Sequence, residues 1–193
     1  MRSIEKLLVS GVVAALGIVP LTALAESSSA TGGGNMSASA RLNLRVTIPA
    51  FLYFQVGTVG ATVDQILFAP TQNEVGSGTP ISGSGGDAAG GSGANVVVRS
   101  NSGQITITES NDAGIGGLGS GGAISLSEIS VTSDNGALGA PTLSDTGGNT
   151  SSPTPNNGSV TDRTAVWTYT YDNNTTPASG TYDAQITYTA ANF

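Results

Sequence analysis

The sequence of 193 residues contains neither cysteine nor histidine, and its only lysine is Lys6. Without cysteine no disulfide can form, so burial and strand pairing must stabilise the fold. Without histidine the chain lacks the commonest general base and the commonest metal ligand. Serine is abundant, but it has no histidine to activate it, and no lysine remains once the first residues are removed. We therefore predict a protein that is not an enzyme and has no catalytic residues.

Basic side chains are also scarce. Six arginine and lysine residues face 13 acidic ones, and the formal net charge is −7. Binding to phosphate backbones needs a basic surface, so nucleic acid is not expected as a partner. The acidity favours solubility and says nothing about the fold.

Long apolar runs are confined to the N-terminus. Arg2 and Lys6 precede the apolar stretch Leu7–Leu24, and Ala23-Leu24-Ala25 has the form of an A-x-A cleavage site. Pro20 and the small residues around it favour cleavage over a membrane anchor. We predict a cleaved signal peptide at residues 1–25 and export through the periplasm.

The exported chain would be residues 26–193. It would have 168 residues, four arginines and 12 acidic residues, so its net charge would be close to −8. This length suits one domain. No later segment is apolar enough to span a bilayer, so we predict no membrane span after cleavage.

Helical periodicity is absent from the exported chain. Short runs rich in Val, Ile, Thr and Tyr are separated by Gly, Ser, Asn, Asp and Pro, a pattern typical of all-β proteins. We predict an antiparallel β-sandwich of about seven to eight strands with long Gly/Ser-rich loops at 70–94 and 138–159. The candidate strands are 38–48, 51–56, 62–68, 95–99, 104–109, 123–132, 164–171 and 180–190.

Turn residues predict how some of these strands connect. "SNSG" after Arg99 suggests a hairpin between 95–99 and 104–109. The last two strands, 164–171 and 180–190, are predicted to form a second hairpin with a shared aromatic face. In 123–132 the apolar residues change parity, which suggests a β-bulge near Ser127 or Glu128.

The most regular alternation lies near the start of the exported chain. After a flexible lead at 26–37, the domain is predicted to span 38–193 and to open with the strand 38–48. Leu42, Leu44, Val46 and Ile48 share one face of this strand, and Pro49 then interrupts pairing. Two interpretations stay open: an ordinary first strand, or a strand that pairs with a neighbouring molecule.

Some residues of the exported chain also suit other binding chemistries. Trp167, Tyr169 and Tyr171 share one face and are expected in the core, although a sugar-stacking platform is the alternative. Turns such as "SDNG" offer oxygen atoms, but none matches a complete calcium loop, so we predict no metal site and no cofactor. A glycosidase would need two opposed carboxylates; the candidates are Asp64, Glu109, Asp112, Glu128, Asp162, Asp172 and Asp183.

Three stretches resemble a known family. "GTYDAQITYTAANF" at the end of the chain resembles the last strand of bacterial chaperone–usher pilins. "ANVVVRSNSGQITITES" is similar to the paired middle strands of such subunits. "ARLNLRVTIP" has the alternation of their N-terminal donor strand.

This resemblance implies an Ig-like sandwich that lacks one strand, which the N-terminal extension of the next subunit fills. Residues 38–48 would be the donor strand, and Leu42, Leu44, Val46 and Ile48 would bind the partner subunit. It also implies copies of itself or related subunits as partners, a periplasmic chaperone, an outer-membrane usher and a place in a surface fimbrium. The alternative is a free-standing secreted β-sandwich that binds polysaccharide or calcium.

Overall fold

The computed structural model describes residues 27–60, 62–111, 117–119 and 123–192. The chain consists of two compact units, Met1–Ile48 and Pro49–Phe193. The predicted signal peptide, residues 1–25, lies outside the described residues. The second unit contains every helix and strand described below.

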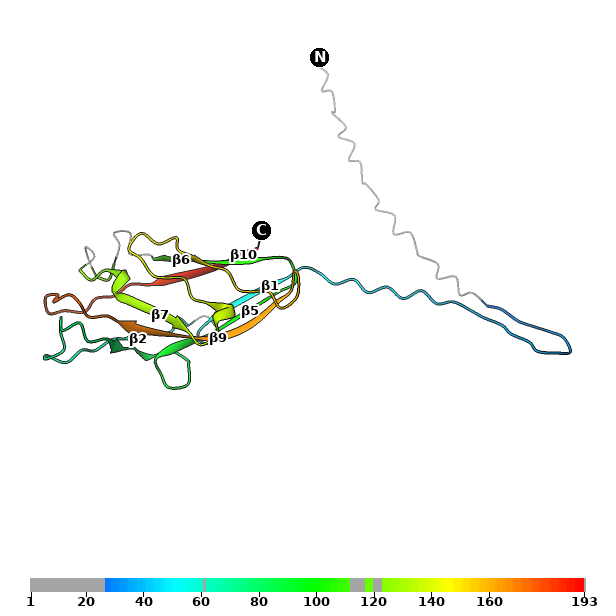
Figure 1. The fold of residues 1–193 in the computed structure, drawn as a ribbon, viewed down its shortest axis with the longest axis horizontal. Helices are drawn as coiled ribbons and strands as arrows, with labels where there is room; N and C mark the ends of the chain where they lie inside the picture. The colour runs from blue at the N-terminus through cyan, green and yellow to red at the C-terminus, as the bar shows by residue number, and fades with distance from the viewer. Residues whose placement is uncertain (1–26, 61, 112–116, 120–122, 193) are drawn as a thin grey trace, which may run out of the picture. The chain divides into compact units, whose positions relative to one another are not determined.

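The first sheet is built around β9 (Thr161–Tyr171). β9 pairs with β5 (Gly93–Ser100), and β5 pairs in turn with β1 (Leu52–Val56). β7 (Ile129–Ser133) and the short β3 (Ile81–Ser82) pair with the last residues of β9. All of these pairs are antiparallel. β1 pairs only with β5 and therefore forms one edge of the sheet (Figure 1).

The second sheet is smaller and has β6 (Ile105–Asn111) at its centre. β10 (Ile186–Asn192) pairs with one edge of β6 and β8 (Thr150–Ser151) pairs with the other. β2 (Ile66–Leu67) and β4 (Ser84–Gly85) form a separate two-stranded ribbon. These pairs are antiparallel too, so the prediction of an all-β, antiparallel protein is confirmed, and the arrangement is consistent with a β-sandwich.

Helix is confined to two short 3-10 turns, η1 (Leu126–Glu128) and η2 (Gly136–Leu138). The side chains of Ser125 and Asn135 cap them, since each accepts a hydrogen bond from a backbone amide two residues later. Among the described residues there is no helix with the length and hydrophobicity needed to cross a membrane.

The core lies between the two sheets, where alternate residues of β5, β6 and β9 face one another. Trp167 is fully buried, its indole nitrogen donates to the carbonyl oxygen of Leu138 at 3.0 Å, and its ring lies edge-on to Tyr188 with centroids 5.1 Å apart. Tyr169 and Tyr171 are buried on the same face of β9. The prediction that these three aromatic residues belong to the core is confirmed.

Both predicted hairpins are wrong. β5 and β6 follow one another through the "SNSG" turn but lie in different sheets, and so do β9 and β10. Figure 1 shows β6 and β10 in a layer distinct from that of β5 and β9. The apolar alternation is the same for a hairpin and for an arch between sheets, because both point alternate side chains into one core. Turn residues therefore predict the change of direction but not the pairing.

The predicted bulge near Ser127 is replaced by η1, which ends where β7 begins. A 3-10 turn shifts the apolar parity as a bulge would, and it buries Leu126 before Ile129 enters the sheet. The predicted loop 70–94 also contains short pairing segments, β3 and β4.

Two tyrosines of the core, Tyr169 and Tyr188, predict how stability depends on alkaline pH. Burial raises the pKa of both Tyr169 and Tyr188, whose hydroxyl oxygens lie 3.3 Å apart. The unfolded chain ionises these phenols near pH 10 while the folded chain keeps them neutral, so folding stability is complete below pH 10 and falls above it. The slope is at most about 1.4 kcal/mol per pH unit for each ring.

We therefore expect the urea midpoint to drop between pH 10 and pH 11.5. Tyr188→Phe and Tyr169→Phe should each reduce the slope by about half. An identical slope in all three chains would contradict this assignment.

Candidate functional site

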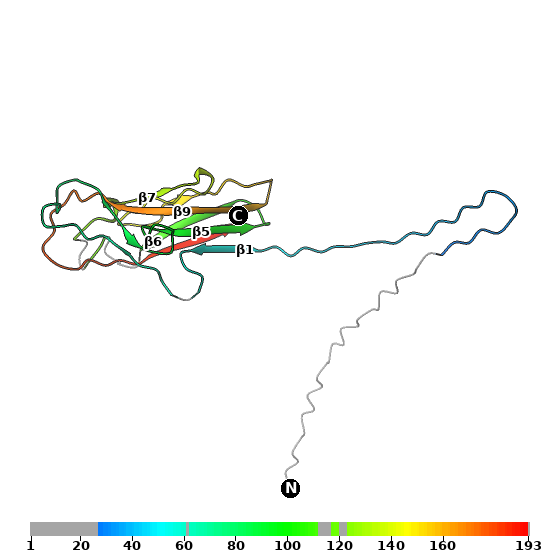
Figure 2. The same cartoon turned by 90° about the horizontal axis from the view of Figure 1, so that it is seen from below.

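The two strands at the sheet edges, β1 and β10, lie next to each other. In Figure 2 β1 runs along one side of the domain with the red C-terminal strand close to it. β1 pairs only with β5 and β10 only with β6 among the described strands. One backbone edge of each strand therefore has no strand partner there, although backbone groups of this kind pair readily with an added strand.

The inner side chains of these two strands are less buried than those of their neighbours. Val96, Val98, Ile105 and Ile107, on the central strands β5 and β6, have no exposed surface. The inner residues of the edge strands pack on the same core but are only partly buried. They are Leu52, Phe54 and Val56 on β1, and Ile186, Tyr188 and Ala190 on β10.

We call these six residues and the backbone of β1 and β10 the open edge. A shallow hollow runs along its β1 side, with Phe54 and Val56 in its lining. Phe51 and Tyr53 add exposed aromatic surface beside it. The combination of unpaired backbone and half-buried apolar side chains makes this the part of the domain best suited to bind an extended chain.

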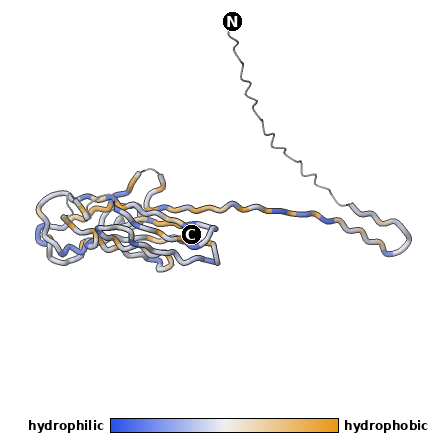
Figure 3. The backbone as a smooth tube through the Cα atoms, turned by 90° about the horizontal axis from the view of Figure 1, so that it is seen from above, coloured by the Kyte–Doolittle hydropathy of each residue, from blue (hydrophilic) through white to orange (hydrophobic). Residues whose placement is uncertain are grey.

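The predicted donor residues lie in the first unit, in a segment that forms no helix or strand. Leu42, Leu44, Val46 and Ile48 are 82, 86, 84 and 74% exposed. Figure 3 shows hydrophobic and hydrophilic residues following one another along this segment. An alternating apolar face with this much exposure is unusual in a soluble chain unless it binds something.

The charges of the two regions have opposite signs. The segment 38–48 contains Arg41 and Arg45 and no acidic residue, whereas residues 49–193 contain 11 acidic residues and two arginines. The side chains of Arg41 and Arg45 alternate with the apolar ones in sequence. Long-range electrostatics favours association between surfaces of opposite charge.

The chain between the segment and β1 is held by Asn101, in the turn after β5. Its side-chain oxygen accepts from the backbone amide of Phe51 at 2.9 Å, and its side-chain nitrogen donates to the carbonyl oxygen of Pro49 at 2.9 Å. The hydroxyl of Ser100 donates to the carbonyl oxygen of Phe51 at 3.1 Å. We call Pro49–Phe51 with these bonds the joint.

The same turn also contacts the C-terminal end of β10. The side-chain nitrogen of Asn192 donates to the carbonyl oxygen of Ser102 at 3.0 Å. The turn 100–103 therefore ties down both the start of β1 and the end of β10. Sequence reasoning missed Asn101, and the only signal that could have pointed to it is its place in the "SNSG" turn.

The acidic residues are dispersed over the domain. Glu109 is buried and accepts from both nitrogens of Asn149, while Asp162 pairs with Arg99 at 3.1 Å. The carboxylate of Asp172 accepts from Ser130. No group of three or more acidic side chains gathers within the described residues, and the candidate Asp112 lies outside them.

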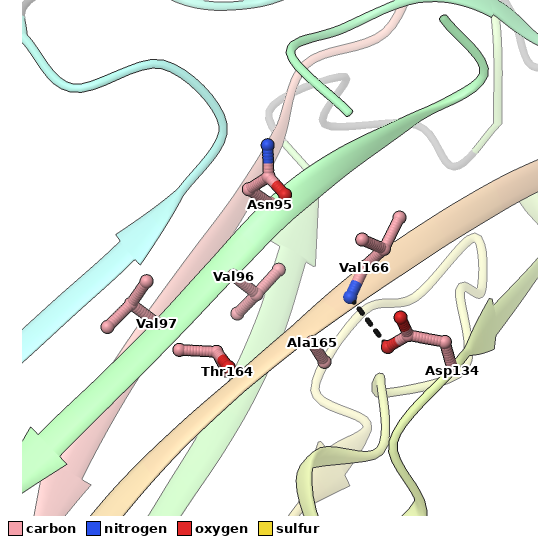
Figure 4. Close-up of a pocket in the computed structure, with 7 residues that line it drawn as sticks. All are labelled: Asn95, Val96, Val97, Asp134, Thr164, Ala165 and Val166. Atoms are coloured by element: carbon pink, nitrogen blue, oxygen red, sulfur yellow. Dashed lines mark hydrogen bonds between the residues drawn. The ribbon is translucent and has the colours of Figure 1, made fainter. Parts of the chain in front are cut away.

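A second hollow lies on the outer face of the first sheet (Figure 4). Asn95, Val97 and Thr164 line it, and Asp134 stands at its side. The carboxylate of Asp134 accepts from the backbone amide of Val166 at 2.8 Å, as the dashed line in Figure 4 marks. The carboxylate of Asp134 therefore bonds the residue after β7 to β9 and stabilises the sheet.

Comparisons with known proteins give no match: neither a family model, nor a curated protein, nor a solved structure is significantly similar to this chain. The features of the chain that bear on its function are therefore the open edge, the segment 38–48 and the joint.

Proposed function

We propose that this chain is an exported structural subunit of a bacterial surface fibre, in which residues 38–48 of one copy add a strand to the open edge of the next. Leu42, Leu44, Val46 and Ile48 would enter the space over the inner residues of β1 and β10. Main-chain hydrogen bonds would supply the pairing, and the alternate side chains would set the register.

The observation that carries this proposal is the order of the strands. In an Ig-like sandwich the first sheet is ABED and the second is CFG. β1, β5, β9 and β7 are paired in the order A, B, E, D, and β6 and β10 correspond to C and F. The chain order of the six strands also agrees with A to F. In this assignment strand G would lie beside β10, and it has no counterpart among the described residues.

The spare strand is at the other end of the chain. Residues 38–48 have the alternation, the exposure and the positive charge that the open edge of an acidic domain would accept. A segment that pairs with the open edge of the next subunit cannot also pair with the open edge of its own domain. Each subunit would therefore donate one strand and accept another. This head-to-tail relation does not close on itself and yields a fibre.

An open edge of this kind is a risk before assembly, because unpaired apolar strands aggregate. We therefore propose that a periplasmic chaperone covers it during export and that an outer-membrane usher receives the subunit. The joint and the hollow along β1 would be accessible to such partners.

The test is a denaturing gel of material sheared from the surface of cells that express the full chain, blotted for this protein with and without boiling. We expect a ladder that collapses to one band on boiling, because added strands dissociate slowly but are not covalent. A monomer band in both lanes would contradict the proposal, and binding to polysaccharide or calcium would then be measured instead.

A further inference from the structure

Only Pro49, Ala50 and Phe51 separate the segment 38–48 from β1, whose outer edge has no partner among the described strands of the same chain. Folding back onto that edge would be an intramolecular event, and short loops close easily. The proposed function therefore needs a reason why the segment pairs with another copy rather than with its own β1. The joint supplies this reason in its sequence and in its hydrogen bonds.

The apolar parity runs through the joint without a break. Leu44, Val46 and Ile48 occupy even positions, and so do the inward residues Leu52 and Phe54 of β1. In a continuous extended chain, residues of one parity share one face. The apolar residues of the segment and of β1 therefore lie on one face if the joint is extended, but not if the joint forms a two-residue turn.

A two-residue turn at Pro49-Ala50 fails in two ways. It would pair Thr47 with Leu52 and Arg45 with Phe54, so polar side chains would face the core and the leucines would face solvent. The favoured two-residue turns also need positive φ at their first central residue, which the ring of Pro49 forbids.

A three-residue turn at 48–50 restores the apolar parity but has the wrong residues. It needs a type I turn followed by a left-handed residue. Pro49 would take the second central position of the type I turn, where proline is disfavoured because it pushes Ile48 out of the helical region. Ala50 would have to be left-handed, a conformation in which the β-carbon of an L-residue lies too close to the following carbonyl oxygen.

The hydrogen bonds of the joint oppose both turns. A hairpin at this point needs the amide and carbonyl of Phe51 to face the returning strand. Instead the amide donates to Asn101 and the carbonyl accepts from Ser100, while the carbonyl of Pro49 is held by the same Asn101 side chain. These bonds fix Pro49–Phe51 along the turn after β5.

We propose that the joint, Pro49-Ala50-Phe51 held by Asn101, prevents residues 38–48 from pairing with β1 of their own chain and so reserves them for a second copy. This inference rests on the proposed function for its biological meaning, but the block on self-pairing can be measured on isolated monomers. Asn101 is then a positioning residue: by holding the backbone of Pro49 and Phe51, it favours pairing of the segment with a second copy over pairing with its own β1.

The test replaces the joint with residues that permit the three-residue turn. The full exported chain receives Pro49→Ser, Ala50→Gly and Asn101→Ala together, because glycine takes the left-handed third position of the three-residue turn and serine, unlike asparagine, does not favour a two-residue turn at 49–50. We expect at least a tenfold rise in the monomer fraction of unboiled samples. We also expect the melting temperature of the dilute monomer to increase and to be independent of protein concentration.

A second variant adds Leu44→Asp to the triple substitution. It distinguishes self-pairing of the segment from a change in stability caused only by the loss of contacts at Asn101. Self-pairing buries Leu44, so this addition should abolish the gain in melting temperature. A simple loss of contacts at Asn101 would lower the melting temperature with or without it. A triple variant that shows the wild-type ladder and no Leu44-dependent gain would overturn the inference.

Failure of the proposed function would look different. The wild-type chain would then form no ladder, while the triple variant could still gain Leu44-dependent stability as a monomer, and the block on self-pairing would stand. If the triple variant gains no such stability, the inference falls whatever the wild-type chain does.

Discussion

Replacing Leu44 with aspartate should abolish the boiling-sensitive ladder. The position lies in the middle of the alternating face of the segment, and its side chain is 86% exposed. In the assembled fibre this leucine would pass from water onto the apolar inner residues of the open edge. Truncating a buried leucine to alanine typically costs about 2–5 kcal/mol, which corresponds to roughly a 30-fold to 3,000-fold weaker association. Aspartate also carries a charge into an apolar site, so the loss should be larger.

The matched control is Asn43→Asp, one residue away on the opposite face. It adds the same negative charge to the segment and so produces the same change in long-range attraction to the acidic domain. Because an odd-numbered side chain would point away from the core, we expect it to slow assembly in low salt and to leave the final ladder intact. Equal loss of the ladder in both variants would mean that charge, rather than the alternating face, governs association.

Much of the fold follows from alternation in the sequence. The pattern in 164–171 predicts that Trp167, Tyr169 and Tyr171 share a buried face, and β9 buries all three. The pattern cannot predict which strand lies beside which, because the side chains of a strand in either sheet point to the same core. Sheet assignment depends on contacts between distant residues, which is why both predicted hairpins turned out to be arches.

The candidate site divides in the same way. Leu42, Leu44, Val46 and Ile48 are visible in the sequence as an alternating face, but that pattern is equally typical of an ordinary first strand. Only the structure shows that these four side chains are exposed and that their segment forms no strand. The open edge is less predictable still, because Ile186 and Tyr188 have the sequence of ordinary core residues, and only the missing neighbour of β10 leaves them half-buried. Asn101 acts through backbone groups of residues 50 positions away, which no local pattern encodes.

Trp167→Ala should remove most of the conformational stability of the isolated subunit. The ring has no exposed surface, donates a hydrogen bond to Leu138 and contacts Tyr188 edge-on. Removing a buried tryptophan costs about 3–5 kcal/mol, and domains of this size are stable by only about 5–15 kcal/mol. A subunit with an open edge should lie near the lower end of that range. The change should be measured by urea unfolding in the Leu44→Asp background, which keeps the chain monomeric. Circular dichroism is the suitable signal because Trp167 is the only tryptophan.

A synthetic peptide of residues 37–49 should restore part of this stability, because it binds the folded subunit and not the unfolded one. At a peptide concentration 100 times its dissociation constant the gain is about 2.7 kcal/mol. Leu143→Ala is the control, since it opens the core at a position on neither edge strand. Tyr188 lies both on Trp167 and on the open edge, so Trp167→Ala should weaken peptide binding while Leu143→Ala should not. If both variants bind the peptide equally well, the added strand does not reach the part of the core that Trp167 supports, and the site on β10 would have to be placed nearer its C-terminal end.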